Sequence, residues 1–381
     1  MSFCAIILNN KYMNKILLTI LLIIFFLSPG LLLAQDLAGE GEVFKAEIIE
    51  ILAEEIEQRE NGTETVKQKL KLEGLDGSLK DKEFIFEESE FDILSTVSYE
   101  VGDKVIVNRS FDFEGDEVFY ITDRVRSGSI IWLGLIFALV VVAIGKLKGL
   151  RALVVLFLTF FIILKFIVPQ ILIGSNPILI SIIGALFILV IAIYITEGFK
   201  TISHVAILSI LISLFITGVL SVLFTELAKI SGFVSEDIMF LMSSSYGAVD
   251  LKGLLLAGII IGSLGVLDDV VIAQVVTVDQ LKKTNPNLGR RDAYKKAMKV
   301  GVSHLSSMIN TLFLAYAGVS LPLLLLFNIN EPPFLGFSQI INNEMVAIEI
   351  VRALTGSIGL VLAIPIATIL AVNFLNNKEF R

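Results

Sequence analysis

The chain has 381 residues, of which 55% are hydrophobic and 18% are charged, and its formal net charge at pH 7 is −8. Apolar runs of about 18 residues or more recur along it, and such runs indicate membrane-spanning helices. The single cysteine, Cys4, excludes an intramolecular disulfide and a cysteine metal site. The absence of a large basic stretch argues against nucleic acid as a partner.

The net charge combines two unlike parts. Residues 36–126 hold 25 acidic and 11 basic side chains, whereas the rest of the chain holds 13 and 19. An acidic, polar segment is therefore joined to a mildly basic and strongly apolar one.

Residues 1–34 are predicted to be a signal peptide or an N-terminal anchor helix. Lys11 and Lys15 precede an apolar run over 16–34, as in both kinds of segment. The Leu32-Leu33-Ala34 triplet is a poor match to a small-x-small cleavage site, so the two interpretations stay open.

Residues 35–127 are predicted to form a small β-rich domain. Short β-branched or alternating runs are separated by Gly and Asp, which is typical of strands and turns. A barrel-like domain, OB-like or SH3-like, fits this number of short strands. The charged stretch at 50–60 could be a helix or a hairpin arm. The predicted strands are 42–49, 65–72, 84–86, 104–108 and 118–122.

Residues 128–381 are predicted to form seven transmembrane helices, which makes the chain a polytopic α-helical membrane protein. Lys and Arg gather in every second loop, so the positive-inside rule places both termini in the cytoplasm and residues 35–127 outside. The predicted spans are 129–145, 151–173, 178–196, 202–224, 251–275, 301–327 and 346–373.

The fifth span carries Asp268 and Asp269 in otherwise apolar sequence, and charge at membrane depth usually serves a function. At about 1.5 Å per residue, Asp269 lies about 9 Å and Asn310 about 13 Å from the inner ends of their spans. We therefore expect the two carboxylates to meet polar groups of the sixth span and to relay a proton or cation. The alternative is that they only hydrogen-bond across helices or reach a water-filled vestibule. The proposed partners are His304, Ser307, Asn310 and Thr311.

Small residues also recur at helical spacing on the fifth and seventh spans. Aligned glycines let membrane helices approach closely, so the last three spans are predicted to pack as one cluster. Glu349 and Arg352 are expected to form an i,i+3 ion pair on the seventh. The predicted packing glycines are Gly258, Gly262, Gly265, Gly356 and Gly359.

Four sequence motifs resemble those of the YibE/F-like family of bacterial integral membrane proteins. They are KGLRAL at 148–153, GIIIGSLGVLDD at 258–269, NTL with AYAG at 310–318, and GSIGL with AIP at 356–365. The resemblance implies a multi-pass protein of the bacterial cell membrane and names no activity. More weakly, GVLDDVVI at 265–272 resembles the fourth-helix motif of RND-type exporters and the SecD/SecF export factors, which implies a proton path through membrane carboxylates.

These features favour a permease or export-assisting protein coupled to proton or cation movement. Its partners would be the lipid bilayer and a small-molecule, ion or exported-protein substrate, with assembly into homo- or hetero-oligomers left open. The alternative is a non-transporting envelope scaffold or sensor that binds a partner through its outer domain. We expect no enzyme, cofactor or metal, since the chain has no phosphate loop, metal-binding His pair or nucleophile elbow. The sixth span also lacks the Asp that an intramembrane aspartyl protease would need.

Overall fold

The computed structural model describes residues 42–58, 64–87, 98–111, 117–232, 249–326, 328, 332 and 334–375. The predicted signal or anchor segment at 1–34 lies outside these residues. The chain divides into two compact units, one within Leu32–Ala143 and the other from Ile144 onward.

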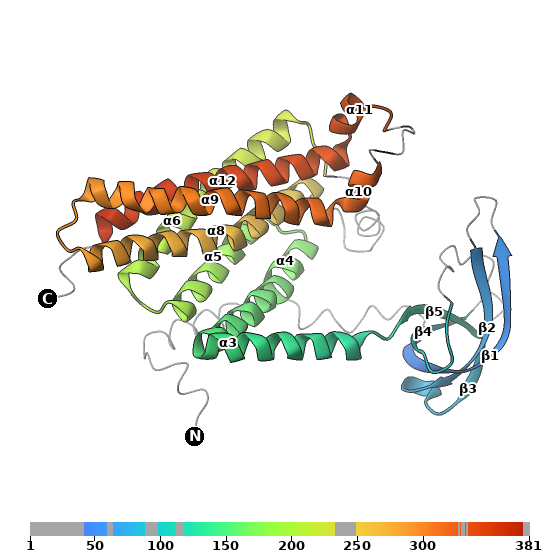
Figure 1. The fold of residues 1–381 in the computed structure, drawn as a ribbon. Coiled ribbons are helices and arrows are strands. Elements are labelled where there is room, and N and C mark those ends of the chain that lie inside the picture. The colour runs from blue at the N-terminus through green and yellow to red at the C-terminus, as the bar shows by residue number, and fades with distance from the viewer. Residues whose placement is uncertain are drawn as a thin grey trace, which may run out of the picture. The chain divides into compact units, whose positions relative to one another are not determined.

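The first unit contains a five-stranded antiparallel sheet with the strand order β3-β2-β1-β4-β5 (Figure 1). All five predicted strands are confirmed, and in three of them, over residues 44–48, 68–74 and 105–107, buried side chains recur at every second position, as in a sheet with one covered face. The strands are β1 (Glu42–Gln58), β2 (Glu64–Gly74), β3 (Glu83–Glu87), β4 (Lys104–Phe111) and β5 (Glu117–Arg124).

The sheet curls into a half-barrel around an apolar core. Phe84 on β3 packs against Phe119 on β5 with ring centroids 4.6 Å apart, so the two edge strands approach each other. Phe84 also packs edge-on against Phe44 of the core at 5.5 Å. The buried core residues are Phe44, Ala46, Ile48, Leu70, Leu72, Phe86, Val105 and Val107.

Strands β1 and β2 extend beyond this core as a hairpin arm, which confirms the second of the two predictions for residues 50–60. In the arm, Ile56 pairs with Val66 and Glu54 pairs with Gln68. Gln68 Nε2 donates to Glu54 Oε2 at 2.9 Å. Ile56 is 64% exposed, so the arm carries apolar side chains that the domain itself does not cover.

The second unit is a bundle of helices. Helix α3 begins in the first unit and continues through a π-helical turn, η3 (Ile163–Ile167), into α4. The helices are α3 (Ser127–Ile162), α4 (Val168–Leu172), α5 (Pro177–Thr196), α6 (Thr201–Leu227), α8 (Leu251–Thr284), α9 (Arg290–Val319), α10 (Leu321–Leu326), α11 (Phe337–Asn342) and α12 (Glu344–Phe374).

Five of the described helical stretches are long and apolar enough to cross a membrane. They are Ser127–Leu172, Pro177–Thr196, Thr201–Leu227, Leu251–Thr284 and Glu344–Phe374. The first, of 46 residues, contains the first predicted span and all but the last residue of the second, and it has non-helical backbone at Lys146 (φ 50°, ψ −129°). Helix α9 is not among the five, because polar side chains interrupt its apolar sequence.

Helices α8 and α12 lie at the centre of the bundle (Figure 1). Helix α12 contacts α6, α8 and α9, and α8 also contacts α5 and α6. The last three predicted spans thus contact one another, and α6 is an additional neighbour that the glycine pattern did not predict.

Candidate functional site

Helix α8 carries the two candidate carboxylates. It begins at an Asp250 cap, whose Oδ1 accepts a hydrogen bond from Gly253 N at 2.9 Å. Its 34 residues present one broad buried face to α5, α6 and α12. Asp268 lies at the edge of this buried face and is half-buried, whereas its neighbour Asp269 is exposed.

Asp268 has a buried carboxylate oxygen without a hydrogen-bond partner among the described residues. Its Oδ1 atom is buried and accepts no hydrogen bond from any described residue. Asp269 and Glu197, which caps the C-terminus of α5, both interact electrostatically with it. Glu197 was not among the residues singled out from the sequence, since nothing in its local pattern shows that α5 ends beside Asp268.

The four predicted polar partners on α9 lie on the exposed surface of that helix. His304, Ser307, Asn310 and Thr311 are all exposed. Thr311 Oγ1 donates to Ser307 O within the same helix at 3.1 Å, and no hydrogen bond in the described chain joins these four residues to either aspartate. The structure therefore does not assemble the predicted relay group within one chain.

The cause is the orientation of α9. Its apolar residues Leu305, Met308 and Leu312 pack against Val270 of α8 and Leu360 of α12. Ser307 and Asn310 lie on the opposite side of the helix, about half a turn away from positions 305 and 312, whereas His304 and Thr311 lie about a quarter of a turn away from them.

The packing glycines divide into two groups. A Cβ atom on Gly359 would lie 1.9 Å from Thr217 Oγ1 on α6, and one on Gly356 would lie 3.6 Å from Ser263 Oγ on α8. Tyr316 Oη would lie 3.9 Å from a Cβ on Gly356 or on Gly262. Nothing lies within 4 Å of a Cβ built on Gly258 or Gly265.

A buried glutamine joins three helices and was missed in the sequence. Gln274 Nε2 on α8 donates to Ala297 O on α9 at 3.0 Å and to Thr368 Oγ1 on α12 at 2.7 Å. A Cβ on Gly301 would lie 2.7 Å from Gln274 Oε1, so α9 passes close to this side chain. A lone amide in an apolar helix is the signal that could have identified it.

Helix α6 carries a second unpredicted feature, a line of buried hydroxyls at i,i+4 spacing. Four of them donate to the carbonyl one turn back at 2.7–3.0 Å. Their spacing is visible in the sequence and indicates one small, polar helix face. The residues are Ser209, Ser213, Thr217, Ser221 and Thr225, all fully buried.

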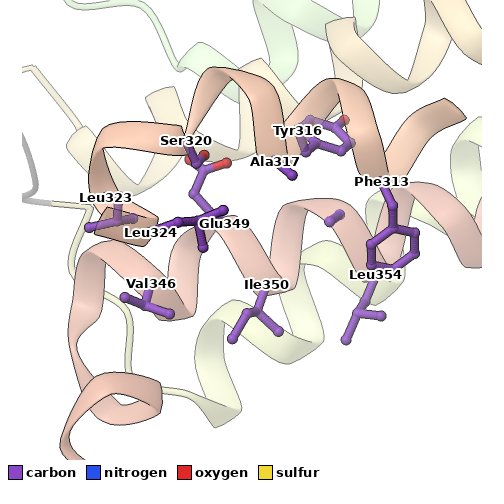
Figure 2. Close-up of a pocket in the computed structure, with 11 residues that line it drawn as sticks. Phe313, Tyr316, Ala317, Ser320, Leu323, Leu324, Val346, Glu349, Ile350 and Leu354 are labelled. Carbon is purple, nitrogen blue, oxygen red and sulfur yellow. The ribbon is translucent and has the colours of Figure 1, made fainter. Parts of the chain in front are cut away.

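A groove of about 280 Å³ lies between α9, α10 and α12 (Figure 2). Apolar side chains such as Phe313, Ile350 and Leu354 line most of it, together with Tyr316. Glu349 also lines it and forms the predicted ion pair with Arg352, with 3.2 Å between Oε1 and Nη1. In the described chain, no group of three His, Cys, Asp or Glu side chains could hold a metal ion.

Comparison with known proteins gives a family assignment that agrees with the motifs. No curated protein and no solved structure matches the chain. The model of the YibE/F-like protein family matches residues 133–377, which include α8, α9 and α12 with both aspartates. The match covers more than half of the sequence, and the chain therefore belongs to the YibE/F-like family.

Proposed function

We propose that the protein couples the movement of a proton or cation to permeation or export, with Asp268 as the central ion-binding group. The buried Oδ1 atom of Asp268, which has no hydrogen-bond partner among the described residues, is the observation that carries the proposal. An unsatisfied buried acceptor costs roughly 1–3 kcal/mol, and more when it is charged. A carboxylate kept only for packing would be expected to have donors around it.

Two neighbouring carboxylates make Asp268 a suitable ion site. Asp269 and Glu197 act on it electrostatically, so a proton or a single cation bound there would relieve repulsion among three acids. Asp269 is exposed and Glu197 is partly exposed, which gives the ion a route between Asp268 and the surface of the unit.

The proposal includes the seven-span topology. Lys146 would turn the chain between two spans within Ser127–Leu172, and α9 with α10 would form the sixth span despite its polar residues. Lys282, Lys283, Arg290 and Arg291 at the α8–α9 connection fit the cytoplasmic side. The sheet domain and its arm would then lie outside the cell membrane, and both termini would lie in the cytoplasm.

The test is ion flux into proteoliposomes that contain the full-length protein. Proton flux under an imposed pH gradient is followed with a pH-sensitive dye, and Na⁺ flux under an imposed Na⁺ gradient is followed separately with a Na⁺-sensitive dye. We expect flux above protein-free vesicles for the wild type and flux at the protein-free level for Asp268→Asn. Asp292→Asn, which changes an exposed carboxylate in the first turn of α9, should behave as the wild type.

Thermal unfolding of each variant in detergent shows whether the fold persists. Wild-type flux in a folded Asp268→Asn variant would contradict the proposal, as would a wild-type protein that conducts neither ion.

One observation favours the alternative function, a non-transporting scaffold or sensor. The hairpin arm exposes Leu52 (42%) and Ile56 (64%) among charged residues, as a docking surface for another envelope protein would. If this is the main function, Leu52→Ser with Ile56→Ser should abolish capture of a partner by the full-length protein. The Asp268→Asn variant should then keep that capture.

A further inference from the structure

Helix α9 presents a polar face that nothing in the described bundle covers. This polar face consists of Ser303, His304, Ser307, Asn310 and Thr311, and all five side chains are exposed. Asn310 has no side-chain hydrogen bond among the described residues, although its amide offers two donors and one acceptor. Lipid tails offer no hydrogen-bond partners, so such a face is unsuited to contact with them.

Helix α8 presents a second face, of different chemistry, that the described residues leave largely uncovered. This open face consists of Gly258, Gly262, Gly265 and Asp269, all of them exposed. Gly258 and Gly265 leave space where a neighbouring helix could approach closely. Asp269 contributes carboxylate oxygens, which accept hydrogen bonds and cannot donate them when ionised.

The two faces match in chemistry and in depth. The polar face is rich in donors, and the open face ends in an acceptor. Measured from the connection between the helices at about 1.5 Å per residue, Asp269 is about 22 Å from the end of α8 at Thr284. By the same rise, His304 is about 21 Å and Ser307 about 26 Å from the start of α9 at Arg290.

We propose that two copies of the chain form a dimer in which the open face of α8 in each copy receives the polar face of α9 from the other. In a two-fold dimer each contact is made twice, and an axis along the membrane normal keeps equal depths together. Asp269 then accepts hydrogen bonds from Ser307 or His304 of the second copy, so the ion site is complete only in the dimer. The inference rests on the proposed course of α9 across the membrane.

A second copy fits these faces better than its alternatives. Within one chain, no hydrogen bond among the described residues joins the polar face to Asp269, and Ser303, Ser307 and Asn310 lie about half a turn from the side of α9 that packs on α8 and α12. An unrelated partner would have to supply both a donor-rich face and a glycine-lined face at matching depths. A second copy supplies both without further assumption.

The test is cysteine cross-linking in native membranes. Cys4 is the only cysteine, so Cys4→Ser gives a cysteine-free background. One chain carries Gly265→Cys and one tag, and a co-expressed chain carries Ser307→Cys and a second tag. The two positions are chosen because they lie at similar depths, about 28 Å and 26 Å from the connection between α8 and α9. Oxidation should yield a disulfide-linked species that carries both tags.

Phe215→Cys replaces Gly265→Cys in the matched control. Phe215 is 73% exposed on α6, and a lipid-facing position there should give only random collisions. A second measurement is the protein mass of the wild type in lipid nanodiscs, which should be twice that of one chain. Gly265→Ile fills the open face and should shift this mass to that of one chain.

Three results would overturn the dimer. The first is a yield of the Gly265→Cys to Ser307→Cys cross-link no higher than that of the Phe215→Cys control. The second is a wild-type mass in nanodiscs equal to that of one chain. The third is a disulfide between Ser307→Cys and Cys4 of the same chain when Cys4 is retained. The last would show that the chain's own N-terminal segment covers the polar face. None of these measurements uses flux, so their failure is distinct from failure of the proposed transport.

Discussion

Gly359 lies where α12 passes α6, and it has no room for a side chain. A Cβ atom there would lie 1.9 Å from Thr217 Oγ1 and 3.2 Å from Thr217 Cβ, whereas ordinary contact begins at 3.4 Å. Thr217 is fully buried, and its hydroxyl donates to Ser213 O at 3.0 Å. Rotation of this β-branched side chain would break that bond or move its methyl group towards the same space. The clash in Gly359→Ala must therefore be relieved by separating the two helices.

The expected cost follows from two opposing effects. Overpacking a well-packed interior costs roughly 1–3 kcal/mol. Alanine favours a helix over glycine by about 1 kcal/mol, which offsets part of that cost. We therefore expect Gly359→Ala to lower the free energy of unfolding by up to about 2 kcal/mol. The melting temperature should fall by up to roughly 8 °C.

The assay is thermal unfolding of the purified full-length protein in a mild detergent. Gly218→Ala on α6 is the matched control, because nothing lies within 4 Å of a Cβ at that position. Thr217→Ala removes the clashing oxygen, so the double variant with Gly359→Ala should recover most of the lost stability. A Gly359→Ala variant as stable as the Gly218→Ala control, or a double variant with purely additive losses, would refute this account of the contact.

Two further predictions concern other parts of the chain. Gln274→Leu removes the hydrogen bonds to Ala297 O and Thr368 Oγ1, so it should lower the free energy of unfolding by about 0.5–2 kcal/mol. The control Gln280→Leu changes an exposed glutamine of the same helix and should leave the free energy of unfolding unchanged. In the sheet domain, hydrogen bonds from the Ser78 hydroxyl and backbone N–H, with Arg109 nearby, hold the pKa of Glu42 below its usual value. Because this pKa is lowered in the folded state, the stabilisation is present above the unfolded-state pKa and is lost as pH falls towards the folded-state pKa. The protection factors of the β1 amides in the full-length protein, which are hydrogen-exchange rates corrected for the intrinsic rate at each pH, should therefore fall between about pH 5 and pH 3, and Glu42→Gln should weaken this dependence.

The elements that depend on local sequence could be predicted. The five strands were located because turn residues bound each run and because side chains alternate between the two faces of a sheet. The Glu349–Arg352 pair could be predicted for a similar reason, since residues three apart on a helix are neighbours whatever else surrounds them. The order of the strands could not be predicted, because β1 pairs with β4 across more than 50 intervening residues.

The arrangement of the helices depends on information that periodicity does not contain. A repeat shows that residues share one face of a helix, but it does not say which neighbour that face meets. The glycine repeat on α12 meets α6 at Gly359, where the sequence suggested only α8 and α9. The repeat ending at Asp269 meets no described neighbour closely over most of its length.

The contrast between α6 and α9 shows why residue type matters as well as position. A buried serine or threonine can donate to the carbonyl one turn back, as Ser209, Ser213 and Ser221 do, so a hydroxyl line can be satisfied within its own helix and still allow close packing. An asparagine has two donors and an acceptor on one short side chain, more than its own helix can satisfy. If α9 crosses the membrane as proposed, Asn310 therefore requires a partner outside α9, and the exposed Asp269 requires a donor. Neither side chain has such a hydrogen bond among the described residues, and this is the physical reason to expect a second copy.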